Sequence, residues 1–587
     1  MERLLTPFGE KLNKDLPLND YPRPQMARDS FINLNGRWNY TLIRDYLGAG
    51  KEEKGEIIVP FSPETILSGV EKIVKPEDKF VYERKFEYKR TNARTLLHFG
   101  AVDYECEVTL NGVLVGSHKG GYFPFTFDVT ETVKEGENVI IVSVTDPTDT
   151  GTQARGKQSS KRGGIWYTPQ SGIWQTVWLE EVAENYVSSL KITPDIDKNE
   201  LEVIVNVCGE KQEATVKAFD GETLMASGET VNGKVTLKID SYETWSPENP
   251  KLYDLEVTVG NDKVKSYFGM RKFGIGKDEN GVSRLMLNNK PYFHNGLLDQ
   301  GYWSDGMYTA PSDEALVYDI LTMKEMGFNM LRKHIKIEPL RWYYHCDRLG
   351  MLVWQDMISG GGIYSPFPIM IRPAFTLILG KRFMAKDGKR RYKYFSRTDE
   401  AGRNEYYEDS ARMIEELYNV VSLAVWVPFN EGWGQFDSEK AYDFYKEKDP
   451  TRIIDHASGW HDQGKGDLNS FHIYFTPFWF FKNGKGDDRP IALTEFGGYS
   501  LQAKGHMYNK EKFFGYRRYY KQEDYDAAMG KLFAEVQKMI HTKGLSATVY
   551  TEVSDVEDEC NGLLTYDRRV VKIDKDLMKK YNENIKL

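Results

Sequence analysis

The first part of the chain alternates apolar and polar residues with the period of two that is typical of β-strands. Residues 106–110 and 113–116 are two such runs, and an Asn-Gly pair at 111–112 separates them. Asn-Gly between two alternating runs favours a tight β-hairpin turn. Residues 138–144 form another strand-like run, and no convincing helical pattern interrupts the series. The pattern predicts a jelly-roll sandwich over residues 1–182.

A second alternating region follows with the length of a small sandwich. Residues 201–207 alternate, an Asn-Gly pair stands at 232–233, and the proline-containing stretch 245–250 is typical of a rigid turn before the last strands. We therefore expect an immunoglobulin-like β-sandwich over residues 183–276.

The period changes after about residue 280, where helical and strand-like segments alternate. Ser312 is placed to cap a helix whose apolar residues share one face, and Gly327 is placed to end it. The apolar run 328–331 is typical of a buried strand. About 300 residues of this βα alternation predict a C-terminal (β/α)₈ TIM barrel over residues 277–587.

Two apolar runs within the predicted barrel each deliver one glutamate at their C-terminal end. Residues 423–427 lead to Asn430 and Glu431, and residues 491–494 lead directly to Glu495. Strands of a TIM barrel carry their chemistry at that end, so both carboxylates are expected in one cleft. Paired carboxylates are the groups with which retaining glycosidases work, one as acid/base and one as nucleophile.

Composition and charge limit the classes of partner that the protein is expected to bind. The chain has 78 Lys and Arg against 87 Asp and Glu, a net charge of −9, with no long basic run. This balance argues against nucleic acid or an anionic membrane as the main partner. The N-terminus has no long apolar stretch, and the 4 cysteines are far apart. We expect a cytoplasmic protein without a signal peptide, a membrane span or a disulfide framework.

Motifs for other chemistries are weak. The sequence has no HExxH pair, no glycine-rich phosphate loop and no GxSxG elbow. We therefore expect neither a metal nor a cofactor. Three further residues stand at or near predicted strand ends, where they can bind sugar hydroxyls or serve the structure alone: His334, His472 and Tyr474.

The order of these regions and several motifs resemble glycoside hydrolase family 2, which contains β-galactosidases and β-glucuronidases. The resemblance covers nearly the whole chain. Its marks include residues 23–25, 34–38, 108–112 and 172–174 in the first region. By this resemblance Asn430 and Glu431 match the family's Asn-Glu pair, with Glu431 as acid/base, and Glu495 matches the nucleophile. His334 resembles a histidine that follows the second strand in the family, and Tyr474 looks like the tyrosine that supports the nucleophile.

The sequence departs from the family where the sugar is recognised. Glucuronidases of the family carry an Asn-x-Lys element, and the similar stretch here has Glu559 and Asn561 instead. An acid there would repel a buried uronate, unless Arg568 or another base substitutes. Asp299-Gln300 stands where galactosidases tend to have His-Glu, and Tyr550 stands where better-known members have tryptophan. Asn561, His472 and Tyr550 are thus candidates for sugar binding.

We expect a retaining exo-β-glycosidase that removes a terminal β-linked sugar, with β-galactose as the leading choice. A glucuronide, a mannoside and an arabinoside stay open as substrates, as does a non-catalytic carbohydrate-binding protein on the same scaffold. Family members often assemble, so a homo-oligomer is also open. Residues 360–403, rich in Lys, Arg and aromatics, fit either a loop that shapes the cleft or a surface insertion.

Overall fold

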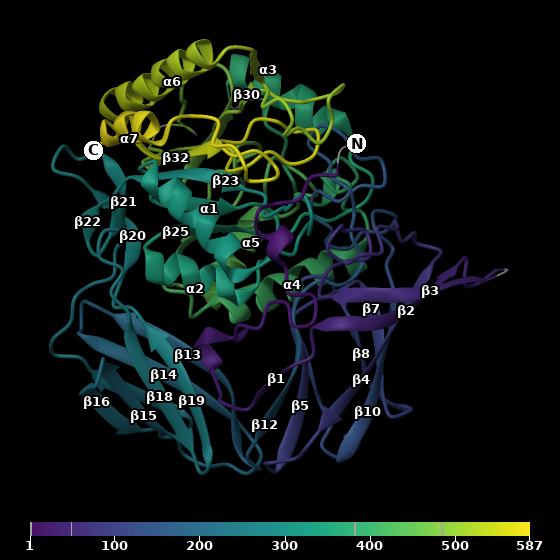
Figure 1. The fold of residues 1–587 in the computed structure, drawn as a ribbon. Coiled ribbons are helices and arrows are strands. Elements are labelled where there is room, and N and C mark those ends of the chain that lie inside the picture. The colour runs from purple at the N-terminus through teal and green to yellow at the C-terminus, as the bar shows by residue number, and fades with distance from the viewer. Residues whose placement is uncertain (1–2, 49, 381–382, 483, 485) are drawn as a thin grey trace.

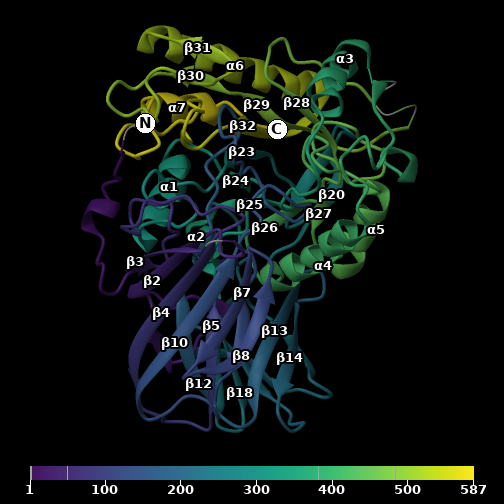
Figure 2. The ribbon, with the colours of Figure 1, turned by 90° about the vertical axis from the view of Figure 1, so that its right-hand side faces the viewer.

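Two β-sandwiches lie beneath one large barrel (Figures 1 and 2). A computed structural model of the chain describes residues 3–48, 50–380, 383–482, 484 and 486–587. The barrel contains the C-terminal part of the chain, and the sandwiches contain the N-terminal half. The predicted multidomain fold class is therefore confirmed.

The N-terminal sandwich is built from two antiparallel sheets. The smaller sheet contains β1 (Phe31–Asn33), β12 (Val177–Val182), β5 (Arg94–Phe99) and β9 (Phe125–Asp128). The larger sheet contains β3 (Lys51–Val59), β2 (Gly36–Arg44), β4 (Lys79–Tyr88), β10 (Gly136–Thr145), β7 (Glu105–Leu110) and β8 (Val113–Lys119). The predicted hairpin joins β7 and β8, with Asn111 at φ 54° and Gly112 at φ 81°. Both residues adopt the left-handed backbone that this turn requires.

A short paired element connects this sandwich to the rest of the molecule. It consists of β6 (Val102–Asp103) and β11 (Gly172–Ile173). Between β10 and β11 lies a long loop, residues 146–171, which contains no helix and no ladder strand. This loop reaches the barrel, because the backbone N–H groups of Arg155 and Gly156 both donate to the Ser359 carbonyl at 3.0 Å. We call residues 146–171 the bridging loop.

The second sandwich also has two antiparallel sheets. One contains β13 (Tyr186–Asp195), β14 (Glu200–Cys208) and β17 (Lys234–Lys238). The other contains β16 (Thr223–Glu229), β15 (Thr215–Asp220), β18 (Tyr253–Val259) and β19 (Asp262–Phe268). A small sheet follows before the barrel, made of β20 (Phe273–Lys277), β21 (Ser283–Leu287) and β22 (Lys290–Pro291).

The barrel is an eight-stranded parallel sheet, and its first and last strands along the chain are paired with each other. The order around it begins with β27 (Ile453–Ile454), β26 (Leu423–Val427), β25 (Leu352–Asp356) and β24 (Met330–Lys333). It continues with β23 (His294–Asp299), β32 (Leu545–Thr551), β29 (Ile491–Gly497) and β28 (Asn469–Ile473). A side pair, β30 (Tyr499–Leu501) and β31 (Arg517–Tyr519), lies outside this sheet.

The helices of the barrel region are α1 (Asp313–Glu325), α2 (Leu340–Leu349), α3 (Arg372–Leu379), α4 (Glu400–Leu417), α5 (Ser438–Lys448), α6 (Gln522–Lys543) and α7 (Lys575–Glu583). Short helical turns are η1 (Gly9–Lys11), η2 (Pro24–Met26), η3 (Phe367–Ile371) and η5 (Lys389–Arg391). As predicted, Ser312 caps α1, its side chain accepting from the Ala315 N–H. Gly327 follows the helix with φ 87°.

The alternation of strands and helices that was expected throughout the barrel is interrupted in two links. Within the described residues, neither the link from β27 to β28 nor the link from β28 to β29 contains an α-helix. The first link, residues 455–468, has three glycines, and the second has prolines at 477 and 490. Glycine and proline are the residues least compatible with a helix interior, so the sequence itself explains these loops.

The sandwiches and the barrel share apolar cores. One cluster joins Tyr122 and Trp174 of the first sandwich to residues of α1 and of several barrel strands. Another joins Trp245 and Tyr267, from the second sandwich region, to Trp354 of β25. The domains are therefore packed as one body.

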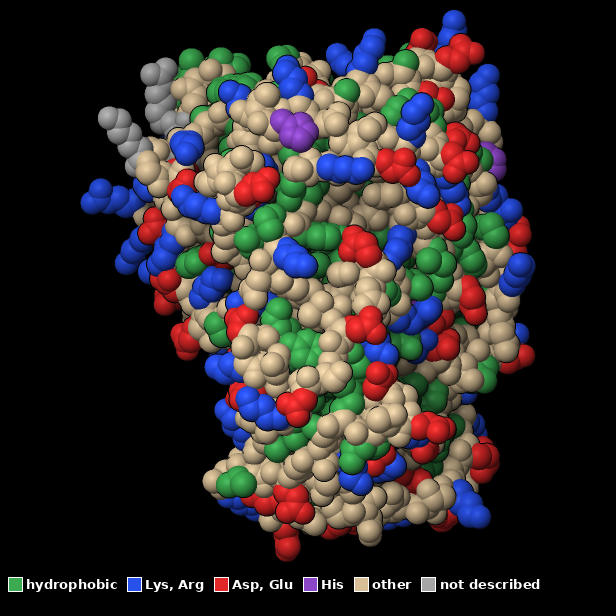
Figure 3. All heavy atoms as spheres, turned by 90° about the vertical axis from the view of Figure 1, so that its left-hand side faces the viewer, with side chains coloured by type: hydrophobic (Ala, Val, Ile, Leu, Met, Phe, Trp, Pro, Cys, Tyr) green, Lys and Arg blue, Asp and Glu red, His purple; other side chains and the backbone are tan. Residues whose placement is uncertain are grey.

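The surface is mixed in charge. Acidic and basic side chains are interspersed over the face in Figure 3, without a broad patch of one sign. In the described part of the chain, no helix has both the length and the apolar character needed to span a bilayer.

Candidate active site

A bulge in β29 sets the direction of Glu495. Strand β28 pairs Phe471 with Leu493 and then His472 with Glu495, so Thr494 is an extra residue in the ladder. A β-bulge re-aims the side chains beside it. Here it places the Glu495 carboxylate in hydrogen bond with the Tyr474 hydroxyl, 3.5 Å from Nδ1 of His472.

The Glu431 carboxylate also lies beside His472. It lies past the end of β26 with φ 51°, a left-handed conformation that few residues with a side chain adopt, and Gly432 follows at φ 77°. Its Oε1 lies 2.7 Å from Nδ1 of His472. Its Oε2 accepts a hydrogen bond from Nε1 of Trp433 at 3.2 Å.

His472 lies between the two carboxylates. One ligand atom each of Glu431, His472 and Glu495 lie within 4.8 Å of one another. A carboxyl separation near 5 Å is typical of retaining glycosidases, whereas inverting enzymes need room for a water between the groups. The same three atoms could also hold an ion by distance alone.

Burial raises the pKa values of the two carboxyls and lowers the pKa of the histidine. Burial raises the pKa of Glu431 to about 7, against the hydrogen bond from Trp433 and the positive charge of Lys157, which both lower it. Burial also raises the pKa of Glu495, but the charge of Arg332 and the hydrogen bond from Tyr474 oppose the rise. Burial lowers the pKa of His472 to about 4, so its ring is neutral at pH 7.

Arg332 holds the strand ends of the site together. Its guanidinium donates to Asp356 at 2.8 and 3.1 Å and to Oδ1 of Asn430 at 2.8 Å. It also donates to the Thr494 carbonyl at 3.0 Å and lies 3.5 Å from Glu495. One buried cation thereby fixes residues at the ends of β24, β25, β26 and β29. The predicted residue Asn430 is part of this network and does not stand alone.

The other predicted histidine lies beside this network. Nδ1 of His334 is 2.7 Å from Oδ2 of Asp356. Burial lowers the pKa of His334 to about 3, which leaves the ring neutral. Tyr474 stacks on Tyr516 with ring centroids 3.5 Å apart, which fixes the phenol that supports Glu495.

Aromatic rings from three parts of the chain gather on the Glu431 side. Trp433 makes edge contacts with Trp166 of the bridging loop at 4.9 Å and with Tyr364 at 5.0 Å. Tyr364 belongs to the segment 360–403, so part of that segment shapes the mouth of the barrel. The segment also exposes apolar side chains of η3 and α3, among them Met370 and Ile378.

The end of β32 forms a polar corner of the mouth. Glu559 accepts from the Tyr167 hydroxyl at 2.5 Å and from Nδ2 of Asn561 at 3.1 Å. Glu552 accepts from Nε2 of Gln300 at 2.9 Å. Burial, with the nearby charge of Glu559, raises the pKa of Glu552 well above its ordinary value. We call Glu552, Glu559 and Asn561 the strand-eight corner.

Tyr550 does not fit the predicted sugar-binding role. Its ring packs against Phe496 and against Phe533 of α6, and its hydroxyl accepts from the Tyr499 N–H at 3.3 Å. The side chain therefore fills the layer between the sheet and α6.

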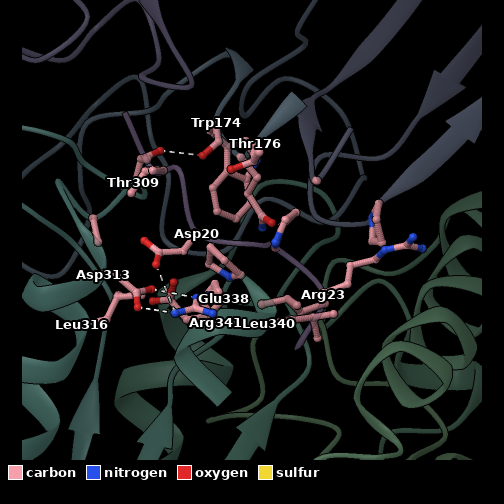
Figure 4. A pocket seen from close by; sticks show the side chains of 18 of the residues that line it. Asp20, Arg23, Trp174, Thr176, Thr309, Asp313, Leu316, Glu338, Leu340 and Arg341 are labelled. Atoms are coloured by element: carbon pink, nitrogen blue, oxygen red, sulfur yellow. Dashed lines mark hydrogen bonds and ion pairs between the residues drawn. The ribbon is translucent and has the colours of Figure 1, made fainter. Parts of the chain in front are cut away.

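A separate cavity of about 70 Å³ lies between the N-terminal segment, the first sandwich and helices α1 and α2 (Figure 4). Trp174 and Thr309 line one side, and Asp313, bonded to Arg341, lines the other. Neither Glu431 nor Glu495 lines it. The cavity lies at the domain interface, away from the paired carboxylates.

Sequence reasoning overlooked several residues of the site. Arg332 was visible at the end of a predicted strand, next to His334, and Asp356 follows an apolar run in the same way. Their positions at strand ends could have identified them as candidate site residues. Lys157 and Tyr167 lie in a loop of another domain, where nothing in the local sequence pattern indicates the barrel.

Three family models match the chain. "Glycosyl hydrolase 2 galactose-binding domain-like" matches residues 64–176, and "Glycosyl hydrolases family 2" matches residues 185–271. "Glycosyl hydrolases family 2, TIM barrel domain" matches residues 280–587.

Curated relatives match over part of their length. The chain is 31% identical over 279 residues to a putative beta-glucuronidase of Formosa agariphila, covering 44% of this chain and 32% of that protein. It is 25% identical over 399 residues to a beta-galactosidase of Leuconostoc mesenteroides, covering 64% of this chain and 35% of that protein. The matched region thus spans about a third of each relative.

Solved structures match over nearly their whole length. The beta-D-glucuronidase of Dictyoglomus thermophilum has a TM-score of 0.73 and 17% identity, covering 96% of this chain and 98% of that chain. A beta-galacturonidase from Eisenbergiella tayi has a TM-score of 0.70 and 19% identity, with coverage of 96% and 98%. At such identities the likeness concerns the fold alone.

Proposed function

Because the chain belongs to glycosyl hydrolase family 2, we propose that it is a retaining exo-β-glycosidase that releases a terminal β-linked sugar. The observation that carries the proposal is the approach of Glu431 and Glu495 to one neutral histidine, all within 4.8 Å. A protein that only binds sugar needs neither an acid nor a nucleophile, so this pair argues against a non-catalytic role.

The two carboxyls take different parts in the proposed reaction. Glu495, held by Tyr474 and Arg332, attacks the anomeric carbon, and the bond to the leaving oxygen breaks. Glu431, with its raised pKa, gives its proton to that oxygen. In the second half Glu431 takes a proton from water, the water attacks the anomeric carbon, and Glu495 is released with the β configuration restored.

A neutral hexose, with β-galactose first, is the sugar that we propose. Glu559 stands in the strand-eight corner and its two oxygens accept from Tyr167 and Asn561. A uronate carboxylate placed beside it would meet an acidic acceptor. Relatives named beta-galactosidase support this choice, while the solved structures named beta-glucuronidase and beta-galacturonidase make uronides the substrates to test against it.

The test is a panel of nitrophenyl β-glycosides assayed with the wild type and with Glu495→Ala. We expect turnover of the best substrate to fall by at least about 10⁴-fold when the nucleophile is lost. Full activity in Glu495→Ala would sink the assignment. Proton NMR of the first product should show the β anomer, and immediate α product would reject retention.

A further inference from the structure

A cation from the first sandwich stands at the mouth of the barrel. Lys157 lies in the bridging loop, directly after Arg155 and Gly156, which are bonded to Ser359 beyond β25. Its ammonium lies over the ring of Tyr167, 5.6 Å from the centroid. Among the described residues, it makes no hydrogen bond and no ion pair.

The backbone around Lys157 is fixed against the barrel on several sides. The Arg155 guanidinium donates to the Gly361 carbonyl at 2.5 Å and to the Gly362 carbonyl at 3.2 Å. Gly156 has φ 63°, and a side chain there would meet the Ile335 carbonyl and the Tyr308 hydroxyl, each at 3.0 Å. The loop is therefore seated on the ends of the second and third strands, and Lys157 has a fixed starting point.

The charge of Lys157 reaches groups from three strands of the barrel. It lowers the pKa of Glu431, of Glu552 and of His334. These residues follow β26, β32 and β24. The contacts agree with this reach, because Tyr167, which lies under the Lys157 ammonium, donates its hydroxyl to Glu559 of the strand-eight corner.

The strand-eight corner holds two further groups without partners. Oε1 of Glu552 and Oδ1 of Asn561 are buried and accept no hydrogen bond from any described residue. Both side chains are fully enclosed, with 0% of their surface exposed. Buried polar atoms are almost always bonded in native proteins, so a donor is expected to reach them. Among the described residues, the corner therefore offers two oxygens without a donor, and the Lys157 ammonium beside it makes no hydrogen bond.

A neutral sugar matches this set of groups. A hydroxyl both donates and accepts, so neighbouring hydroxyls can accept from an ammonium and donate to carbonyl and carboxyl oxygens. A carboxylate only accepts. Placed here, it could accept from the Lys157 ammonium, but it would have no proton to give to Oδ1 of Asn561 and would lie near the acidic Glu559.

Building on the proposed glycosidase function, we propose that Lys157 binds a hydroxyl of the sugar that is cleaved, opposite the free oxygens of Glu552 and Asn561. The N-terminal sandwich thus supplies a specificity-determining residue to the barrel. Glu559 acts with it by opposing an acidic sugar in the same corner.

The experiment uses the full chain and the neutral nitrophenyl β-hexoside that the wild type hydrolyses best, with its monodeoxy analogues and its uronide. Lys157→Met should lower kcat/KM for the parent hexoside by about 10- to 100-fold, the usual effect of losing a charged hydrogen bond. One deoxy analogue, lacking the partner hydroxyl, should be hydrolysed at the same rate by both proteins. Lys161→Met is the control, because Lys161 is an exposed residue of the same loop.

Glu559→Gln is a second test, made on the acidic residue of the strand-eight corner. It should raise the ratio of kcat/KM for the uronide to that for the parent hexoside. An equal loss on every analogue with Lys157→Met would mean a structural role and overturn the inference, as would a wild type that prefers the uronide. Failure of the proposed function is distinct: the wild type would then hydrolyse no glycoside, or Glu495→Ala would stay active.

Discussion

Glu431 must hold its proton at the pH of the reaction if it is the acid. Burial raises its pKa to about 7, and the Trp433 hydrogen bond opposes that rise by favouring the carboxylate. The protonated fraction falls as the pH passes upward through this pKa, so kcat/KM should decline above about pH 7. Trp433→Phe removes the opposing hydrogen bond, and the decline should move to higher pH.

The measurement is the pH profile of kcat/KM for both proteins. Trp479→Phe serves as the control, since Trp479 is 40% exposed and its ring packs on Phe481. The assignment also requires that Glu431→Gln abolish the alkaline decline. A decline that persists in Glu431→Gln, or that moves to lower pH in Trp433→Phe, contradicts it.

Arg332 is expected to matter for stability as well as for activity. It is fully buried and pairs with Asp356, which is also fully buried. Arg332→Met leaves that carboxylate without its cation, a change that costs about 3–5 kcal/mol for a buried pair. Urea unfolding should show this loss. Arg37→Met, which breaks an ion pair with half-exposed partners, should cost less than about 1 kcal/mol; equal effects would argue against a special role for the buried pair.

Single residues could be predicted from the sequence where a strand pattern fixed their position. Glu431 and Glu495 follow apolar runs, and the structure brings them together. Tyr550 was misjudged because every residue of its strand is buried, so no alternation of buried and exposed positions indicates which side the ring takes. Lys157 could not be predicted, because its place depends on how one domain packs on another.

At the scale of elements, the cap of α1 offers a clean test. Ser312 accepts from the Ala315 N–H, as the sequence predicted. Ser312→Ala should lower the free energy of unfolding by about 1 kcal/mol, because the Ala315 N–H then keeps only its bond to the Ser312 carbonyl. Ser227→Ala on β16 is the comparison, since its hydroxyl is bonded to no described residue, and a change within about 0.5 kcal/mol is expected. Urea midpoints would measure both; an unchanged midpoint for Ser312→Ala would argue against the cap.

Elements were predictable where local chemistry defines them. Asn111-Gly112 forms the expected turn, and Gly350 ends α2 in the left-handed conformation at φ 72°. The loops that replace helices after β27 and β28 were missed because the alternation was extended over glycine-rich and proline-containing stretches. The bulge at Thr494 was beyond prediction, since it arises from the pairing of β29 with two neighbours at once.

The whole molecule should unfold as one unit. Apolar clusters join the first sandwich to the barrel through Tyr122 and Trp174, and the second through Trp245. Domains with large shared apolar interfaces lose their independence. Calorimetry, tryptophan fluorescence and circular dichroism should therefore give coincident transitions. Two well-separated transitions would show that the sandwiches and the barrel fold separately.

The bridging loop also sets when the site can exist during synthesis. Lys157 is made about 400 residues before Asn561, so a long stretch of translation separates the groups proposed to hold one sugar. N-terminal domains generally fold first during synthesis. The first sandwich would then wait with its loop exposed until the eighth strand arrives, and a nascent chain would acquire activity only after residue 561 has been made.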